Sequence, residues 1–248
     1  MDTRTPPRPV AIVTGGSRGI GAAIAERLAA DGHAVVVNYA GRRQDAEQVV
    51  ERILAGGGEA IALQADVADP AAVQRLFEAA EARFGGIDVL INNAGVMSLK
   101  PVAETDDDQF DRMVDINLKG SFNAMREAAR RVRDGGRIVN VSTSVVGVKL
   151  ETYGVYAATK AAVELLTAIL SKELRGRSIT VNAVAPGPTG TDLFLEGKSP
   201  ELIERMARMN PLERLGTPDD IAAVVSFLAG PQGGWINGQI VRANGGMV

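Results

Sequence analysis

The chain has 248 residues, of which 46% are hydrophobic and 23% charged, and its formal net charge at pH 7 is −3. This length suits one α/β domain with a sizeable buried core, and the weak negative charge without a long basic run argues against a nucleic-acid partner. With no cysteine and one histidine, His33, the chain cannot form disulfides, a thiolate metal site, a His-based metal cluster or a Ser-His-Asp triad. No apolar run approaches the roughly 18 residues of a membrane span, so we expect no membrane association. The lack of cysteine is compatible with a reducing cytoplasm, which is the expected location.

Residues 1–9 are polar and proline-rich, and we expect them to form a disordered lead-in to a single domain at residues 10–248. Apolar strand-like runs then alternate with longer helix-like segments. Strands are predicted, in chain order, at Val10–Thr14, Ala34–Asn38, Ala60–Gln64, Val89–Asn92, Arg137–Val141, Ile179–Val184 and Gln239–Arg242. Helices are predicted at Ile20–Ala30, Arg42–Ala55, Pro70–Phe84, Thr105–Val132, Val155–Arg175, Glu201–Met209 and Pro218–Leu228, with a looser stretch at Pro186–Pro200.

This alternation of strands and helices predicts an α/β fold: a single doubly wound, Rossmann-type parallel sheet with helices on both faces. The strand segments are continuously apolar, as expected for strands that are buried on both faces of a sheet. In such folds ligands bind beyond the carboxyl ends of the strands, near the point where the strand order reverses. Functional residues are therefore expected at these strand ends.

A glycine-rich turn follows the first predicted strand, at Thr14–Gly21. Glycines let the backbone approach a ligand closely, and the free N–H groups at the start of the next helix can bind phosphate. Gly15, Gly19 and Gly21 give the spacing G-x-x-x-G-x-G, which differs from the G-x-G-x-x-G dinucleotide fingerprint. A tight strand–helix connection would also explain the turn, but its glycine density and its position favour a phosphate site.

Polar residues also follow the fourth and fifth predicted strands and interrupt the longest predicted helix. Asn92–Gly95 and Ser142–Ser144 stand at strand ends, although such residues also stabilise ordinary turns. Asn117 lies among apolar neighbours in the helix and must find hydrogen-bond partners. For an isolated residue of this kind, a structural role is the default interpretation.

Tyr156 and Lys160 lie four residues apart in a predicted helix, so their side chains share a face and can reach one ligand. A tyrosine has an unperturbed pKa of roughly 10, and a neighbouring positive charge stabilises the phenolate and lowers that pKa. The pair is therefore a candidate general acid–base. Taken alone it is weak evidence, because Tyr-x-x-x-Lys also occurs by chance on solvated helices.

Together and in this order, the motifs resemble those of the short-chain dehydrogenase/reductase family over essentially all of residues 10–246. The matching pieces are Thr14–Gly21, Asp66-Val67, Asn92–Gly95, Asn117, Ser142–Ser144, Tyr156 with Lys160, and Pro186-Gly187. Within the family the chain is most similar to NADP(H)-dependent reductases of the 3-oxoacyl carrier-protein and glucose dehydrogenase types. The resemblance implies an oxidoreductase that transfers a hydride between NADP(H) and the carbonyl or secondary alcohol of a small, moderately apolar substrate.

The resemblance also assigns roles. Tyr156 would exchange a proton with the substrate oxygen, while Lys160 would hold the nicotinamide ribose and lower the pKa of the tyrosine. Asn117 would hold a water that links Lys160 to solvent, and a hydroxyl at 142–144 would polarise the carbonyl. The family usually carries serine thirteen residues before the tyrosine, where this chain has Thr143. Either Thr143 takes that role, which we favour, or a local bulge presents Ser144.

No acidic residue directly follows the second predicted strand, where a carboxylate would bind the adenosine ribose of NAD and repel a 2′-phosphate. Arg42 and Arg43 follow this strand, and Arg18 lies in the glycine-rich turn, where family members contact the 2′-phosphate. Arginine suits phosphate because its planar guanidinium donates two hydrogen bonds, although Arg42 and Arg43 could simply begin a solvated helix. We therefore predict NADP(H) rather than NAD(H). The resemblance implies cofactor contacts at Gly15, Ser17, Arg18, Gly19, Ile20, Asn38, Tyr39, Ala40, Asp66, Val67, Asn93, Ala94, Gly95, Tyr156, Lys160, Pro186, Gly187, Thr189 and Thr191.

The substrate pocket and the assembly are also expected by resemblance. The loop Asp192–Pro200 is expected to be mobile without ligand and to cover the substrate. Helices such as Thr105–Val132 and Val155–Arg175 usually form a dimer interface in the family, and segments such as Trp235–Val248 a second one, which implies a homotetramer. The chain carries Asn244 where relatives usually have Asp before the last glycines. Candidate substrate contacts are Val145, Val146, Val148, Leu150, Tyr153, Leu193 and Phe194.

Two other functions are compatible with parts of the sequence. One is a catalytically inactive NADP(H)-binding protein with a regulatory or scaffold role, which the presence of Tyr156, Lys160 and Asn117 disfavours. The other is a methyltransferase or another nucleotide-binding α/β enzyme, which the ordered later motifs disfavour. The motifs do not specify the substrate.

Overall fold

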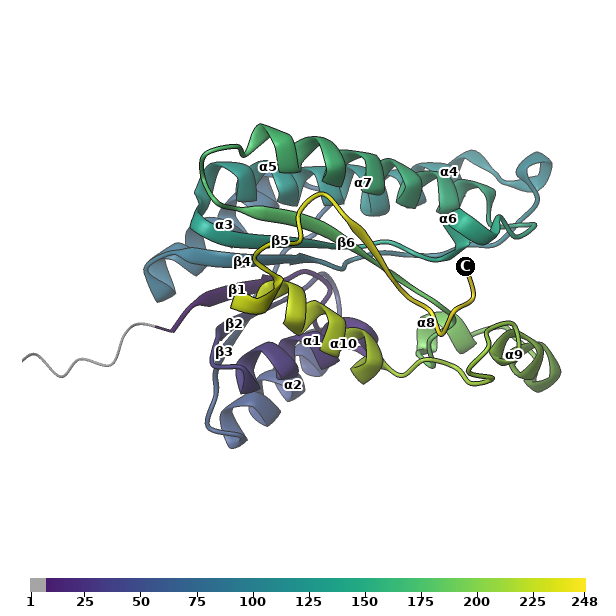
Figure 1. The fold of residues 1–248 in the computed structure, drawn as a ribbon, viewed down its shortest axis with the longest axis horizontal. Helices are drawn as coiled ribbons and strands as arrows, with labels where there is room; N and C mark the ends of the chain where they lie inside the picture. The colour runs from purple at the N-terminus through teal and green to yellow at the C-terminus, as the bar shows by residue number, and fades with distance from the viewer. Residues whose placement is uncertain (1–7) are drawn as a thin grey trace, which may run out of the picture.

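The computed structural model describes residues 8–248, so residues 1–7 of the predicted lead-in lie outside the described part of the chain. Seven parallel strands form one sheet in the order β3-β2-β1-β4-β5-β6-β7 (Figure 1). The order reverses at β1, between β2 and β4, which creates a switch point at the carboxyl ends of the strands. The doubly wound parallel sheet predicted from the sequence is therefore confirmed. The strands are β1 (Val10–Val13), β2 (Ala34–Tyr39), β3 (Glu59–Gln64), β4 (Ile87–Asn92), β5 (Val132–Val141), β6 (Thr180–Pro186) and β7 (Ile240–Ala243).

Helices cover both faces of the sheet (Figure 1). One layer contains α1 (Gly19–Ala30), α2 (Arg43–Ala55) and α10 (Pro218–Ala229). The opposite layer contains α3 (Pro70–Phe84), α4 (Asp107–Met113), α5 (Ser121–Arg131) and α7 (Gly154–Glu173). The short helices α6 (Val145–Val148), α8 (Asp192–Leu195) and α9 (Pro200–Ala207) lie beyond the carboxyl ends of the strands. Single 3₁₀ turns occur at Val102–Glu104 and Pro231–Gly233.

The strands divide their side chains between two cores, because neighbouring residues in a strand point to opposite faces of the sheet. Ala11 and Val13 of β1 pack with α1, α2 and α10, whereas Ile12 packs with α3 and α5. Every residue of β1 and β2 is buried. Each large apolar side chain buried in this way contributes about 1.5–3 kcal/mol relative to exposure, which accounts for the continuously apolar strand sequences.

The predicted long helix Thr105–Val132 is not one regular helix. A π-helical segment at Val114–Gly120 separates α4 from α5 and contains Asn117, and Val132 begins β5. A Cβ at Gly120 would lie 2.6 Å from the side chain of Val67, so this close approach to the segment after β3 requires a glycine. Such π segments are frequent at functional sites.

Two further boundaries differ from the predictions. β5 begins before Arg137, because its first residue, Val132, already pairs with Ile87 ahead of a register shift. The glycines at 135 and 136 hide this continuity in the sequence. The stretch predicted to be loose at Pro186–Pro200 contains the helical turn α8.

From the sequence we expected no membrane span, yet α7 is long and apolar enough to cross a membrane by length and composition alone. An 18-residue window within its 20 residues has a mean hydropathy of 1.2, and 22% of this window is buried. One such helix is weak evidence, because helices of soluble proteins pass the same test. Val163 and Thr167 of α7 are buried, so the helix forms part of the layer that covers the sheet.

Candidate active site

A cleft of about 640 Å³ lies at the carboxyl ends of the strands, within the size range of small-molecule and cofactor sites. Among the residues predicted to act in catalysis, Thr143, Ser144, Tyr156 and Lys160 line this cleft, and Asn117 does not. Every residue predicted to contact the cofactor also lines it: Gly15, Ser17, Arg18, Gly19, Ile20, Asn38, Tyr39, Ala40, Asp66, Val67, Asn93, Ala94, Gly95, Tyr156, Lys160, Pro186, Gly187, Thr189 and Thr191.

The glycine-rich turn after β1 is fixed against the end of β4. The Thr14 hydroxyl accepts hydrogen bonds from the backbone N–H groups of Asn93 (2.9 Å) and Ala94 (3.0 Å). The side-chain amide of Asn93 donates to the carbonyl oxygen of Gly15 at 3.1 Å. A Cβ at Gly21 would lie 2.3 Å from that same oxygen, so only glycine lets α1 start this close to the turn. α1 has no acidic residue in its first turn and no side-chain cap, so its first N–H groups can bind phosphate.

Asn38 fixes the end of β2 and is buried. Its side-chain amide donates to the carbonyl oxygens of Leu63 (3.3 Å) and Ala65 (3.0 Å) at the end of β3. Its side-chain oxygen accepts a hydrogen bond from the backbone N–H of Gly15 at 3.3 Å. Asn38 therefore ties β2, β3 and the glycine-rich turn together, in addition to lining the cleft.

Two arginines line the cleft beside the ends of β1 and β2. Arg18 forms an ion pair with Asp192 at 3.9 Å, and Arg42 pairs with Asp45 at 3.4 Å. Both pairs are solvent-exposed, and such pairs contribute only about 0–1 kcal/mol, so a phosphate group could replace the carboxylates. Arg43 does not line the cleft and instead pairs with a glutamate one helical turn away.

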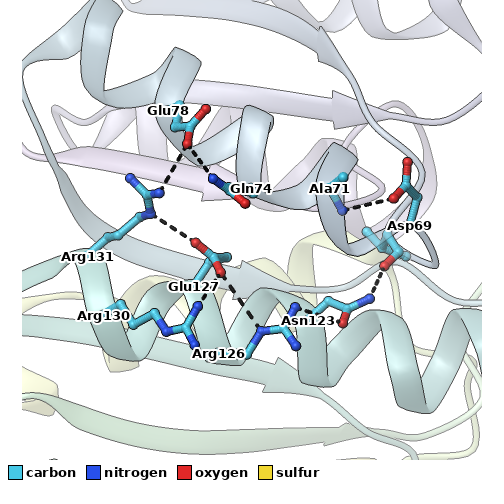
Figure 2. A network of polar contacts seen from close by, with 10 residues as sticks. Asp69, Ala71, Gln74, Glu78, Asn123, Arg126, Glu127, Arg130 and Arg131 are labelled. Carbon is cyan, nitrogen blue, oxygen red and sulfur yellow. Dashed lines mark hydrogen bonds and ion pairs between the residues drawn. The ribbon is translucent and has the colours of Figure 1, made fainter.

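The segment after β3, which carries Asp66 and Val67, is held in place by α5. The buried side chain of Asn123 donates a hydrogen bond to the carbonyl oxygen of Val67 at 2.9 Å. Figure 2 shows Asn123 beside a network of charged residues in which the buried carboxylate of Glu127 faces three arginines of α5. One of these, Arg131, also pairs with Glu81 of α3 at 2.7 Å. Together these contacts join α5 to α3 and hold the cofactor side of the cleft.

Tyr156 lies in the first turn of α7, and its ring meets that of Tyr153 edge-on, with centroids 6.4 Å apart. Burial raises the pKa of Tyr156 to about 12, because loss of hydration disfavours the phenolate, and the hydrogen bond with Thr143 acts in the opposite direction. The net direction is opposite to the lowering that we expected from Lys160. The reason is that the loss of hydration outweighs the favourable contacts of the phenolate.

Lys160 is buried one turn further along α7. Its ammonium group donates a hydrogen bond to the carbonyl oxygen of Val141, at the end of β5, at 2.8 Å. Burial lowers the pKa of Lys160 to about 8. A Cβ at Gly95 would lie 3.3 Å from the side-chain oxygen of Asn117 and 3.5 Å from the ammonium nitrogen of Lys160, so Gly95 packs directly beside both side chains.

Asn117 is fully buried and braces the segment after β4. Its side-chain oxygen accepts from the N–H of Val96 at 2.8 Å, and its side-chain amide donates to the carbonyl oxygen of Val96 at 2.9 Å. The same amide donates to the hydroxyl of Thr159, next to Lys160, at 3.3 Å. Asn117 therefore connects this segment to α7, and its role in holding a water stays a prediction.

The three hydroxyl residues after β5 have different partners. Ser142 donates to a carboxylate of α7 at 2.6 Å. Ser144 donates to a carbonyl oxygen of β6 at 3.0 Å and accepts from the side-chain amide of Asn244 at 2.9 Å. The Thr143 hydroxyl accepts from the backbone N–H of Val145 at 3.3 Å, and of the three it is the one that acts to lower the pKa of Tyr156. The geometry thus favours Thr143 over Ser144 as the hydroxyl that accompanies the phenol.

The structure brings together most of the predicted substrate contacts. Val146 and Val148 do not line the cleft, because successive side chains of the helical turn α6 point in different directions. The predicted contacts that do line it are Val145, Leu150, Tyr153, Leu193 and Phe194. Sequence reasoning missed others, which no motif or periodicity marks: Met97, Arg112, Ile116, Met206 and Met247.

These features fit an NADP dinucleotide. The glycine-rich turn and the N terminus of α1 suit a pyrophosphate, and no carboxylate stands at the first positions after β2 to repel a 2′-phosphate. Arg18 and Arg42 offer guanidinium groups for that phosphate, and Lys160 lines the same cleft. Among residues 8–248, no group of three His, Cys, Asp or Glu side chains is placed to hold a metal ion.

Comparison with known proteins covers nearly the whole chain. A family model described as enoyl-(acyl carrier protein) reductase matches residues 15–248. The chain is 48% identical over 249 residues to a short-chain type dehydrogenase/reductase of Picea abies, and the aligned region covers 96% of this chain and 92% of the relative. It is 44% identical over 261 residues to the NADPH-dependent aldehyde reductase-like protein, chloroplastic, of Arabidopsis thaliana, covering 98% and 97% of the two chains.

Solved structures show the same similarity in three dimensions. A short-chain dehydrogenase from Burkholderia cenocepacia in complex with NADP superposes with a TM-score of 0.91 at 40% identity, over 96% of this chain and 97% of that one. The angucycline C-6 ketoreductase LanV with bound NADP superposes with a TM-score of 0.91 at 38% identity, over 96% and 95% of the chains.

Proposed function

The chain belongs to the short-chain dehydrogenase/reductase family, and from this premise we propose how its residues act. It is an oxidoreductase that transfers a hydride between NADP(H) and a carbonyl compound or the corresponding alcohol. The observation that carries this function is the convergence of Tyr156, Thr143 and Lys160 in the cleft that also contains the glycine-rich turn.

NADPH supplies the hydride when it is bound, and the chain supplies position and proton transfer. The phenol of Tyr156, kept neutral at working pH by a pKa of about 12, donates its proton to the substrate oxygen as negative charge grows there. The Thr143 hydroxyl beside it donates a second hydrogen bond to the same oxygen. In alcohol oxidation the phenolate form of Tyr156 accepts the proton of the alcohol.

Lys160 supports this proton transfer from one helical turn away. Near neutral pH its ammonium is largely charged, since its pKa is about 8, and a positive charge favours the phenolate that forms as the proton leaves. The ammonium is fixed by the Val141 carbonyl oxygen, and Lys160, which lines the cleft, would hold the nicotinamide ribose. Asn117 fixes the neighbouring segment, and we assign to it the water that returns a proton to Lys160.

The cofactor is NADP(H). Arg18 and Arg42 are the groups assigned to its 2′-phosphate, because both line the cleft beside the end of β2. The backbone of the glycine-rich turn and the first N–H groups of α1 are assigned to the pyrophosphate.

The variant Tyr156→Phe tests this function. It keeps the ring and its contact with Tyr153 but removes the acidic proton, so we expect NADPH binding close to that of the wild type and a loss of kcat of about 10²–10⁴-fold. NADPH binding is measured by fluorescence enhancement and turnover by NADPH oxidation with a panel of aldehydes, ketones and quinones. Tyr153→Phe, which removes the neighbouring hydroxyl, is the matched control and should keep most of the turnover.

The result also separates this function from the alternative of an inactive NADP(H)-binding protein. If the wild type bound NADPH but oxidised none with the whole panel, the inactive protein would be the better description. Turnover that survives Tyr156→Phe at the wild-type rate would instead reject the assigned proton donor.

A homotetramer is the assembly that we propose for this enzyme. Large apolar side chains are exposed on α4, α5 and α7, where Phe110, Phe122, Leu165 and Ile169 lie, and contiguous exposed apolar surface favours association. A second group lies near β7 and includes Trp235, which is 99% exposed. Light scattering should give a mass of about four chains, and a stable monomer at micromolar concentration would contradict the proposal.

The cytoplasm is the location that we propose. The absence of cysteine suits a reducing compartment, while the name of one relative places that protein in the chloroplast. Imaging of a fluorescent fusion in the source cell would test this location.

A further inference from the structure

Three methionines line the cleft from three segments that are distant in the sequence. Met97 follows β4, Met206 lies in α9, and Met247 lies in the C-terminal tail, defined here as residues 244–248. These segments follow β4, β6 and β7, whereas Arg18 and Arg42 follow β1 and β2. Met247 belongs to the side of the cleft that contains Thr143 and Tyr156, because Asn244 binds both the Met247 N–H and the hydroxyl of Ser144.

The C-terminal tail is held in this site by hydrogen bonds. The side-chain amide of Asn244, a buried residue, donates to the Ser144 hydroxyl at 2.9 Å, directly beside Thr143. The Asn244 side-chain oxygen accepts from the backbone N–H groups of Gly246 (3.0 Å) and Met247 (3.2 Å). This turn fixes the backbone of Met247 relative to the catalytic hydroxyls.

Both sides of the tail are packed closely. A Cβ on Gly147 of α6 would lie 2.7 Å from the side chain of Val248, and a Cβ on Gly245 would lie 2.5 Å from the side-chain oxygen of Asn210, just after α9. Gly245 has a φ of 66°, a conformation that other residues rarely adopt. Figure 1 shows the C terminus between α6 and the pair α8 and α9. The tail thus joins the two helical elements that border the substrate side.

Methionine side chains are suited to an adaptable apolar binding surface. They are unbranched and polarizable, adapt to irregular shapes, and make favourable sulfur contacts with aromatic rings. Tyr153 and Phe194 also line the cleft and add aromatic surface. A carbonyl compound with a bulky aromatic group would be in contact with this surface, whereas a short aliphatic one would not fill it.

We infer that Met97, Met206 and Met247 form the binding wall for the aromatic part of the carbonyl substrate, and that Met247 is a specificity-determining residue positioned by the C-terminal tail. This inference rests on the proposed function, since it concerns the substrate of the same site. The substrate class is a carbonyl compound with a bulky, apolar aromatic group.

The test compares 2-naphthaldehyde with propanal, two aldehydes that differ in the aromatic group. For each variant the ratio of kcat/KM values for the two aldehydes is measured with NADPH from product formation. Met247→Ala should lower the ratio of 2-naphthaldehyde to propanal by about tenfold, mainly through the KM for 2-naphthaldehyde. Met247→Leu conserves the volume and should stay within about threefold of the wild-type ratio.

Met209→Ala is the matched control, because Met209 follows α9 closely, is 39% exposed and does not line the cleft. Its ratio should equal that of the wild type. A ratio that is unchanged or higher in Met247→Ala, with a wild type that reduces both aldehydes, would overturn this inference alone. A wild type that reduces neither these aldehydes nor any compound of the panel above would overturn the proposed function itself.

Discussion

Replacing Gly21 by alanine tests how firmly the glycine-rich turn is held. Gly21 lies in the first turn of α1 with an ordinary helical backbone, where alanine would by itself favour the helix by about 1 kcal/mol. The added Cβ would, however, lie 2.3 Å from the carbonyl oxygen of Gly15 and 2.5 Å from the side-chain nitrogen of Asn93. Both atoms belong to the hydrogen-bonded connection between β1 and β4, so α1 must move away from the turn.

The size of the effect follows from these contacts. Overpacking costs about 1–3 kcal/mol, and the shift breaks the two hydrogen bonds from Asn93 to Thr14 and Gly15, which contribute about 0.5–1.5 kcal/mol each. After subtraction of the gain in helix propensity, the net loss of stability is about 3 kcal/mol. For a chain of this length, that loss lowers the Tm by about 6–12 °C. NADPH affinity should fall by more than about tenfold, because the displaced N–H groups no longer face the phosphates.

The assay is thermal unfolding with and without NADPH, together with NADPH titration by fluorescence. Gly56→Ala is the matched control, because Gly56 ends α2 at a φ of −78° and an added Cβ would meet its nearest atom at 3.5 Å. Its stability should stay within about 0.5 kcal/mol of the wild type. If Gly21→Ala melted with the wild type and bound NADPH equally well, the close packing of α1 against the turn would be refuted.

Three further predictions concern the charged and hydroxyl groups of the cleft. Arg18→Ala should raise the Kd for NADPH by about tenfold or more, since a hydrogen bond to a charged group contributes about 1.5–3 kcal/mol. The Kd for NADH should change far less. Equal weakening of NADPH and NADH binding would contradict the assignment of Arg18 to the 2′-phosphate. Thr143→Val should lower kcat by about 10²–10³-fold, while Thr143→Ser and Ser144→Ala keep most of it; the reverse pattern in steady-state kinetics would give the role to Ser144. Folding lowers the pKa of Lys160 from 10.5 to about 8, because burial disfavours its charged form. The buried lysine therefore leaves the free energy of unfolding highest above pH 10.5, where it is neutral in both states, and this stability is lost as the pH falls through 8. The wild-type Tm should therefore rise relative to Lys160→Met between these pH values, and a constant difference would exclude the shift.

The glycine-rich turn and the Tyr156–Lys160 pair could be predicted from the sequence because local geometry determines their positions. A glycine cluster directly after an apolar strand must lie at the carboxyl edge of the sheet, and a spacing of four residues in a helix puts two side chains on one face. The same reasoning located Asn93 and Thr143, which follow neighbouring strands. In each case the residue lies within a helix or directly after a strand whose type is clear from the sequence.

The remaining features depend on contacts between distant segments. The π-helical segment around Asn117 arises where Gly120 approaches Val67, and neither residue reveals that contact in the sequence. The pKa of Tyr156 rises because the folded chain removes water from the phenol, which no spacing rule predicts. Met206 and Met247 meet at the cleft only after α9 and the tail have folded over it.

The central place of β1 in the sheet has a consequence for synthesis of the chain. β1 pairs with β2 on one side and with β4 on the other, yet β4 begins only at Ile87. Until β4 has been synthesised, one edge of this wholly apolar strand is unpaired, and unpaired edges can pair with strands of other chains. Parallel pairing across such a separation is also slow. We expect the emerging N-terminal half to need chaperone protection, and slower translation at low temperature to favour soluble enzyme over inclusion bodies.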